Sequence, residues 1–346
     1  MALKPTHFRS LFHTPLTYYH ALSQISSTHS SSQNKTLQQS IVASIESKAY
    51  QQIPDLLNAS DPSHQNPNPF SFLSTLPETH QLRLIDDILQ SFIPIRPRSK
   101  PRLAYSHLLS HTLQSPNPLP LALAVLQRTL RSGCLPVPQT HLLLSNAFLA
   151  RLQENQTVPS ILSEMHSIGY SPDVGTCNYL IQSLCKIDHV HEGVQVLRGI
   201  SKIECFPDLD SFNVLVSEMS ELRRTGEILE MVREMVKVHG LSPRKETIVK
   251  AVSAMRANRD VWRAVEMIEF LEGEGVGVGF EAYESVLEGC LEIRRFVLAG
   301  KFVVVMTGKG FIPYIRVRQR VFEGLIGVGE TELAMVVRRR FSDLKS

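Results

Sequence analysis

The sequence has few of the features that indicate a secreted protein, a metalloprotein or a membrane protein. Its cysteines are scattered and show no CxxC spacing, so we predict reduced, buried thiols and neither a disulfide framework nor a metal site. No run of about 18 apolar residues occurs, which predicts no membrane insertion. The net charge of the 346 residues is only +3, and this balance neither favours nor excludes nucleic acid as a ligand.

Catalytic signatures are equally scarce. The glycine-rich stretch at 273–279 follows a helical pattern, whereas a phosphate-binding loop needs a strand before it and a helix after it. The GKG sequence at 308–310 lacks the glycine spacing of such a loop. His189 and His191 lack a third and a fourth ligand at suitable spacing for a metal. We therefore predict a protein that is not an enzyme and that has no metal and no cofactor.

Acidic residues are missing from the start of the chain, and the first of them is Glu46. Residues 1–45 contain Lys4, Arg9 and Lys35 together with many serines and no continuous hydrophobic region. This composition predicts a disordered organelle transit peptide, with a plain disordered tail as the alternative. The expected compartment is the mitochondrion, with the chloroplast as the alternative.

The next segment, 46–100, is expected to be an N-terminal helical cap and a linker. Helical patterns at 36–57 and 80–93 are separated by a loop rich in proline, serine and asparagine. A basic, proline-rich stretch at 94–102 then marks the boundary with the rest of the chain. A cap is expected because the open end of a helical stack would expose apolar surface.

The remaining segment, 101–346, contains a pattern that recurs about every 35 residues. Cys177, Phe212, Ile248 and Tyr283 follow one another at intervals of 35, 36 and 35 residues. Each period contains two short helical patterns, and a proline precedes several of the new periods. A fixed period of this length with two helices predicts a helical solenoid, in which stacked units bury one another's apolar faces.

We therefore predict an all-α, right-handed superhelical solenoid of helix-turn-helix units. It should contain about six units and a final partial one. The expected boundaries are about 102–137, 138–173, 174–208, 209–244, 245–279 and 280–314, with the partial unit from 315.

The unit at 174–208 contains the string NYLIQSLCK, followed by EGVQVL and then PD. On these residues and on the 35-residue period, the chain resembles the pentatricopeptide repeat family of plant organelle RNA-binding proteins. The tetratricopeptide family has a similar helix pair on a 34-residue period, but the longer period and the proline before new units favour the former.

The resemblance implies that each unit reads one RNA base. In the family, the fifth residue of the first helix and the last residue of the unit contact the base edge, and the second residue packs on its face. In the unit at 174–208, which matches the family pattern best, these residues are Asn178, Asp208 and Gly175, with an implied preference for uracil. Lys186 of this unit is expected to face a phosphate. In the next unit, Asn213 and Arg244 are the corresponding pair.

Other units depart from the family pattern. The next base-edge positions hold Val249 with Gly279 and Glu284 with Tyr314, and the packing position is acidic in three units (Asp210, Glu246 and Glu281). An acid there loses stacking area, which is worth about 1–3 kcal/mol per base, and repels phosphate.

The function implied by the resemblance is non-catalytic binding of single-stranded RNA, in transcript processing, stability or translation. Because of the departures, the alternative is a helical scaffold that binds proteins of an organellar ribosome or RNA-processing complex. The single tryptophan, Trp262, could anchor such a partner if it were exposed, but we expect it to pack against a neighbouring unit.

Overall fold

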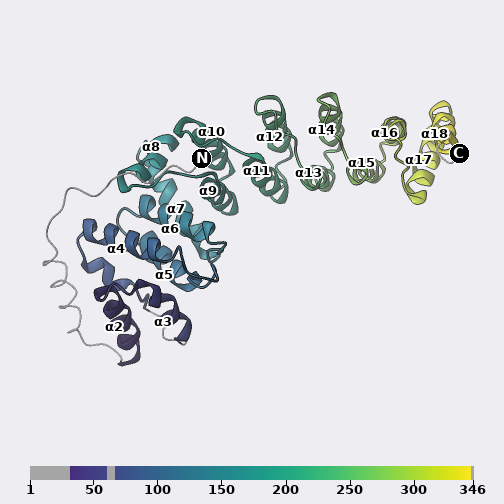
Figure 1. Ribbon diagram of the computed structural model, residues 1–346. Helices are drawn as coiled ribbons and strands as arrows, with labels where there is room; N and C mark the ends of the chain where they lie inside the picture. Colours follow the sequence, from purple (N-terminus) through teal and green to yellow (C-terminus); the bar gives the residue numbers. More distant parts are fainter. Residues whose placement is uncertain (1–31, 61–66, 344–346) are drawn as a thin grey trace. The chain divides into compact units, whose positions relative to one another are not determined.

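The computed structural model describes residues 32–60 and 67–343, and in these ranges the chain is helical, without strands (Figure 1). None of the described helices combines the length and the apolar character needed to cross a membrane. The chain divides into an N-terminal part that ends at Thr176 and a C-terminal part that begins at Cys177. We describe each part by itself.

The N-terminal part consists of short helices joined by turns. Helix α2 (Ser32–Glu46) begins inside the segment 1–45 that the sequence predicted to be disordered, and it includes the start of the helical pattern predicted at 36–57. The physical reason is that Ile41 and Ile45 are buried. Residues 1–31, with most of the predicted targeting peptide, lie outside the described residues. The helices are α2 (Ser32–Glu46), α3 (Ile53–Ala59), α4 (Glu78–Ser91), α5 (Arg102–Leu113), α6 (Leu119–Arg131), α7 (Gln139–Gln153) and α8 (Val158–Ser163), the last followed by a 3-10 turn at Glu164–Ile168.

The C-terminal part is a series of helical hairpins. Helices α11, α13, α15 and α17 form one row and α12, α14, α16 and α18 form the other, as Figure 1 shows. The first helices from α11 to α17 contact one another in succession, and among the second helices α12 contacts α14 and α16 contacts α18, which confirms the predicted stack of repeats. The helices are α9 (Val174–Lys186), α10 (Val190–Ile200), α11 (Leu209–Glu221), α12 (Thr225–Lys237), α13 (Lys245–Ala257), α14 (Val261–Gly273), α15 (Phe280–Glu292), α16 (Phe296–Gly308), α17 (Ile315–Gly327) and α18 (Thr331–Asp343).

The backbone of the turns repeats as regularly as the helices do. Inside the hairpins, the second residue after the first helix has a left-handed conformation, with φ between 55° and 64° at Asp188, Arg223, Arg259 and Arg294. A second left-handed position, usually glycine, follows each second helix, for example Gly275 with φ 76°. The left-handed residues therefore recur with the repeat.

The core follows the 35-residue period that the sequence shows. The fourth residue of each first helix from α9 to α15 is at most 2% exposed: Cys177, Phe212, Ile248 and Tyr283. The eleventh residue of each second helix from α10 to α16 is fully buried: Ile200, Met235, Leu271 and Met306. The recurring apolar residues are therefore the contacts that hold the stack together.

The last unit differs from its prediction. The sequence indicated a partial unit after 314, but α17 and α18 are each 13 residues long, like the helices of the units before them. The apolar pattern is obscured because Arg318 stands at the position of Tyr283 and Arg338 at that of Val303. The hairpin still forms because its remaining core residues, such as Val321 and Val337, are fully buried.

Candidate functional site

The structure brings Asn178 and Asp208 together. Asn178 is the fifth residue of α9, and its Nδ2 donates a hydrogen bond to Asp208 Oδ1 over 3.4 Å. The Asn178 Oδ1 is buried and has no hydrogen-bond partner among the described residues. A buried acceptor without a partner costs about 1–3 kcal/mol, so this amide is poised to gain from a donor supplied by a ligand.

Asp208 is held in place because it also caps the next helix. Its Oδ1 accepts hydrogen bonds from Ser211 N at 2.8 Å and Ser211 Oγ at 3.0 Å, while Ser211 Oγ accepts from Asp208 N. This reciprocal capping box fixes the carboxylate at the start of α11 and leaves the side chain exposed at the surface. The last residue of one unit is therefore the first anchor of the next.

The two other residues predicted in this unit lie on the surface. Gly175 is exposed near the start of α9, and a side chain there would have room, since the nearest atom to an added Cβ is 3.9 Å away. Lys186 Nζ lies 3.1 Å from Glu218 and 3.4 Å from Glu221 of the next unit. The hydrogen bond to Glu218, with the charges of both glutamates, raises the pKa of Lys186, so the lysine stays charged but shares its charge with two carboxylates.

The next predicted pair, Asn213 and Arg244, is arranged differently. Asn213 is only 7% exposed, its Oδ1 accepts a hydrogen bond from Thr247 Oγ1 at 2.8 Å, and its Nδ2 is buried without a partner among the described residues. Arg244 instead forms an exposed ion pair with Asp210 at 2.5 Å. The acid at the packing position of this unit is therefore neutralised, which the sequence did not predict.

Glu284 shows a third arrangement at the same position. It is 5% exposed, and its Oε1 accepts a hydrogen bond from the backbone N–H of Tyr314 at 3.2 Å. Burial raises the pKa of Glu284, and the charge of Glu288 acts in the same direction. Glu284 thus holds the backbone N–H of the residue just before α17, and because it is buried it does not present a bare carboxylate to a phosphate backbone.

Three residues at the fifth position of a first helix share a feature that recurs with the period of the repeat. Asn178, Asn213 and Glu284 each keep one buried side-chain atom without a hydrogen-bond partner among the described residues. Their spacing of 35 and then 71 residues is one and two periods. Most buried polar atoms in folded proteins are paired, so a periodic set of exceptions marks this position as unusual.

The sequence analysis missed the corresponding face of the last unit. Arg316, Gln319 and Arg320 occupy the second, fifth and sixth positions of α17, and all three are exposed. Here the packing position is basic, whereas Asp210, Glu246 and Glu281 are acidic at that position. The signal was the string RVRQR, which went unnoticed because this unit was read as partial.

Trp262 corrects a second expectation. We expected its ring to pack against a neighbouring unit, but it is 57% exposed as the second residue of α14. Its position lies off the buried stripe formed by Val261, Ala264, Val265 and Ile268.

The cysteines and other possible metal ligands carry no site in the described part of the chain. The side chains of Cys134, Cys177, Cys185, Cys205 and Cys290 are buried, and burial raises the pKa of Cys185 and Cys290 to about 12. Among the described residues, no three histidine, cysteine or acidic side chains gather closely enough to hold a metal ion.

Comparisons with known proteins identify a relative that matches the whole chain. No family model matches the sequence. The chain is 49% identical, over 100% of both sequences, to the pentatricopeptide repeat-containing protein At1g06270 of Arabidopsis thaliana.

Solved structures give a more distant likeness. The crystal structure of the pentatricopeptide repeat protein PPR10 from maize matches with a TM-score of 0.40 and 14% identity, covering 95% of this chain and 56% of that one. The same maize protein in complex with an 18-nucleotide psaJ RNA element matches with a TM-score of 0.37 and 15% identity, covering 95% and 57%. The chain therefore spans little more than half of the maize protein. On the full-length identity to the Arabidopsis relative, together with its stack of 35-residue helical hairpins, this chain belongs to the pentatricopeptide repeat family.

Proposed function

We propose that this protein binds single-stranded RNA without catalysis, through the fifth and last residues of its C-terminal units. The observation that carries the proposal is the Asn178–Asp208 pair, in which an amide and a fixed carboxylate meet at the junction of two units. An amide beside a carboxylate offers donors and acceptors to the edge of a base. Members of this family read one base per helical repeat with two or three side chains, so a pair at this place suits the task.

The charges around the fifth and last residues of the units support the proposal. The sequence suggested that acids at the packing position would repel phosphate, but one of them, Asp210, is paired with Arg244. Two further acids of the first helices are also paired, Glu221 with Lys186 and Glu292 with Arg256. Exposed ion pairs of this kind leave little net field at physiological salt. The last unit adds Arg316 and Arg320 to the face that would carry the RNA.

The setting follows from the family and the N-terminal composition. We propose an organellar transcript as the ligand, in a mitochondrion with a chloroplast as the alternative, and a role in processing, stability or translation. The support for an organelle is the acid-free composition of residues 1–45.

The test is RNA binding by variants of the best pair. Asn178→Ala combined with Asp208→Ser removes the amide and the carboxylate, while serine keeps the helix cap. We expect at least about tenfold weaker binding to a uridine-rich oligonucleotide, measured by fluorescence anisotropy at several salt concentrations. The affinity of the unmodified protein should fall as salt rises, with a slope that reports the number of phosphates contacted.

The matched control is Asn258→Ala, which removes an asparagine amide just after α13, away from the fifth and last residues of the units. This amide bonds the carbonyl of Arg223 in a turn, so its loss should leave RNA affinity unchanged. Equal affinity of the double variant and the unmodified protein would exclude Asn178 and Asp208 as base readers. Absence of RNA binding even at low salt would refute the proposed function as a whole.

A protein-binding scaffold remains the second candidate because Trp262 is exposed. Tryptophan is enriched among the residues that dominate protein interfaces, and 57% exposure makes its ring accessible. Co-purification of a protein that is lost with Trp262→Ala, in the absence of RNA binding, would favour this candidate.

A further inference from the structure

The last unit exposes a face whose equivalent in each earlier unit is covered. We define the end face as Arg318 and Phe322 of α17 with Arg338 and Phe341 of α18. The equivalent positions in the unit before it are Tyr283, Leu287, Val303 and Met306, and all of them are at most 1% exposed. In the end face, Arg338 is exposed and the other three are half-buried.

The same four positions are apolar and buried in every earlier unit of the C-terminal part. These units have a successor, whereas no described helix follows α18. The successor is therefore what covers these positions. In the units 174–208, 209–244 and 245–279 the positions hold Cys177, Ile181, Leu197 and Ile200, then Phe212, Val216, Val232 and Met235, then Ile248, Val252, Ile268 and Leu271.

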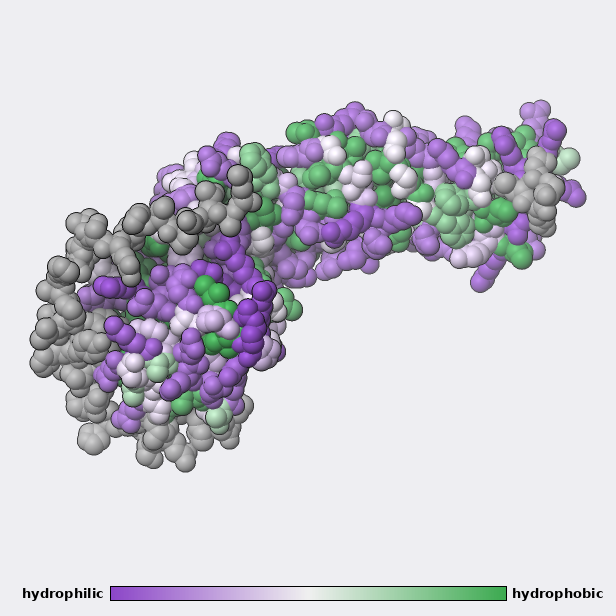
Figure 2. All heavy atoms as spheres, in the orientation of Figure 1, coloured by the Kyte–Doolittle hydropathy of each residue, from purple (hydrophilic) through white to green (hydrophobic). Residues whose placement is uncertain are grey.

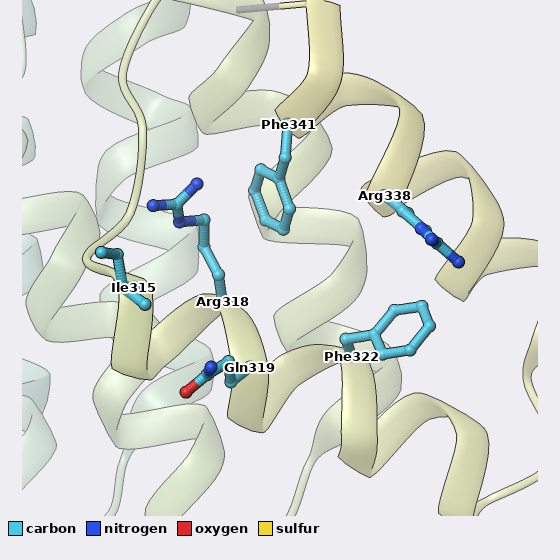
Figure 3. A pocket seen from close by; sticks show the side chains of 6 residues that line it. All are labelled: Ile315, Arg318, Gln319, Phe322, Arg338 and Phe341. Carbon is cyan, nitrogen blue, oxygen red and sulfur yellow. The ribbon is translucent and has the colours of Figure 1, made fainter. Parts of the chain in front are cut away.

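The end face contains a pocket between α17 and α18. Its volume is about 320 Å³, and it is lined by the four end-face residues together with Ile315 and Gln319, as Figure 3 shows. The Arg318 guanidinium lies 5.5 Å from the centroid of the Phe341 ring, and its Nε is buried without a hydrogen-bond partner among the described residues. The pocket is thus apolar in its walls and cationic, with no acidic residue in its lining.

Two arginines of the inner units show which groups of a following unit lie opposite this face. Arg198, the ninth residue of α10, binds Glu234 of the next second helix at 2.6 Å, and Arg233, the ninth residue of α12, binds Glu266 of the next at 2.7 Å. Arg339 is the ninth residue of α18. It forms no ion pair with residues 67–342, whose side chains the structure describes. The last unit therefore keeps an arginine whose equivalents in α10 and α12 bind a glutamate from a following helix, whereas α14 and α16 hold Glu269 and Val304 at this position.

A basic end face disfavours two possible occupants. A second copy that docked the same face would bring Arg318, Arg338 and Arg339 against their own equivalents, and like charges at an interface cost several kcal/mol. The chain's own first 45 residues contain no acid that could pair with these arginines. Figure 2 shows hydrophilic and apolar side chains side by side over the last helices, a mixture that fits an amphipathic partner.

We propose that the end face binds an acidic amphipathic helix of a partner protein, which packs where a further unit would. Its apolar stripe fills the pocket against Phe322 and Phe341, and its carboxylates pair with Arg338 and Arg339. The inner units favour a helix over RNA here, because at the equivalent positions it is helices carrying glutamates that are bound. The inference goes beyond RNA binding and does not depend on it.

The test uses the full chain and a pair of synthetic helical peptides of about 20 residues, long enough to form a helix in isolation. One peptide carries a leucine stripe flanked by glutamates, and the other has lysine in place of every glutamate. By fluorescence anisotropy, we expect the acidic peptide to bind and the basic peptide not to bind. Arg338→Glu with Arg339→Glu should weaken binding of the acidic peptide at least about tenfold, as loss of interfacial charge pairs does.

The matched control is Arg340→Glu. Its equivalent, Glu234, binds Arg198 of the preceding unit, so this position faces away from the end face. It should leave peptide binding unchanged although it changes the charge of the same helix. Phe341→Ala, which keeps every charge, should also weaken binding, and circular dichroism should show all variants to be folded.

Three outcomes would overturn the proposal. These are failure of the acidic peptide to bind, equal binding of both peptides, and an equal effect of Arg340→Glu. Loss of affinity for a uridine-rich oligonucleotide in the Arg338→Glu/Arg339→Glu variant, without an effect on the peptide, would assign the end face to RNA instead. Failure of RNA binding alone would leave this proposal intact and would refute only the function proposed above.

Discussion

The inner units and the last unit share one backbone plan but differ in what covers them. From α9 to α16, the four positions equivalent to the end face are apolar in each unit and at most 2% exposed. In α17 and α18 the same positions hold Arg318, Phe322, Arg338 and Phe341, and none of these is fully buried. Burial at these four positions therefore depends on place along the array, because they are core only where another unit follows.

The largest expected effect is a swap of these environments. Ile268 is the inner equivalent of Arg338 and is fully buried. Ile268→Arg would bury a charge without a partner and should lower the free energy of unfolding by about 4 kcal/mol or more. Arg338→Ile should change it by less than about 1 kcal/mol, because the site is exposed. Urea unfolding followed by circular dichroism measures both, and similar losses in the two variants would contradict the comparison.

A smaller effect is expected at the fifth position of the first helix. Glu284 is buried beneath the junction with the next unit, whereas its equivalent in the last unit, Gln319, is exposed. Because burial raises the pKa of Glu284, the folded state holds the proton more tightly than the unfolded state. Stability should therefore decrease as pH rises from about 4.5 through the folded-state pKa.

Glu284→Gln removes this titration and keeps an oxygen that can accept from Tyr314 N–H. We expect the variant to melt a few degrees above the unmodified protein at pH 7 and at the same temperature near pH 4. Gln319→Glu is the control, since an exposed carboxylate should show no such dependence. A difference between Glu284→Gln and the unmodified protein that stays constant from pH 4 to pH 7 would argue against the raised pKa.

The smallest effect concerns the ion pairs between units. Arg198→Ala removes an exposed pair with Glu234 and should cost about 0.5–1 kcal/mol at low salt, less in high salt. Arg339→Ala removes the equivalent arginine where no described carboxylate lies nearby, and should cost nothing measurable. Equal effects of the two variants in urea unfolding would mean that pairing with the next unit contributes no stability.

Much of the fold could be predicted because the core repeats. The interval between Cys177, Phe212, Ile248 and Tyr283 fixed the period, and each of these residues proved buried. The starts of α11, α13, α15 and α17 coincide with the predicted unit boundaries at 209, 245, 280 and 315. The last unit was underestimated because arginines at Arg318 and Arg338 interrupt the apolar pattern without interrupting the helices.

The candidate site was less predictable because its residues interact across units. The proximity of Asn178 and Asp208 followed from the family resemblance, and the structure brings them within hydrogen-bond distance. The pairing of Lys186 with Glu218 and of Arg244 with Asp210 joins residues 32 and 34 positions apart, which a pattern within one unit does not reveal. The exposure of Trp262 depends in the same way on what the neighbouring helices leave uncovered.

The matching turns have a consequence for how such a chain can change in length. The junctions before α13, α15 and α17 each contain a left-handed glycine and lead into a first helix of 13 residues. Deleting residues 245–279 would join Phe280 to Arg244 at the place that Lys245 has now. The array could therefore lose or gain a whole unit without changing the connections between the remaining units. A single inserted residue inside a helix would instead rotate all side chains beyond it by about 100° and move the apolar stripe off its neighbour.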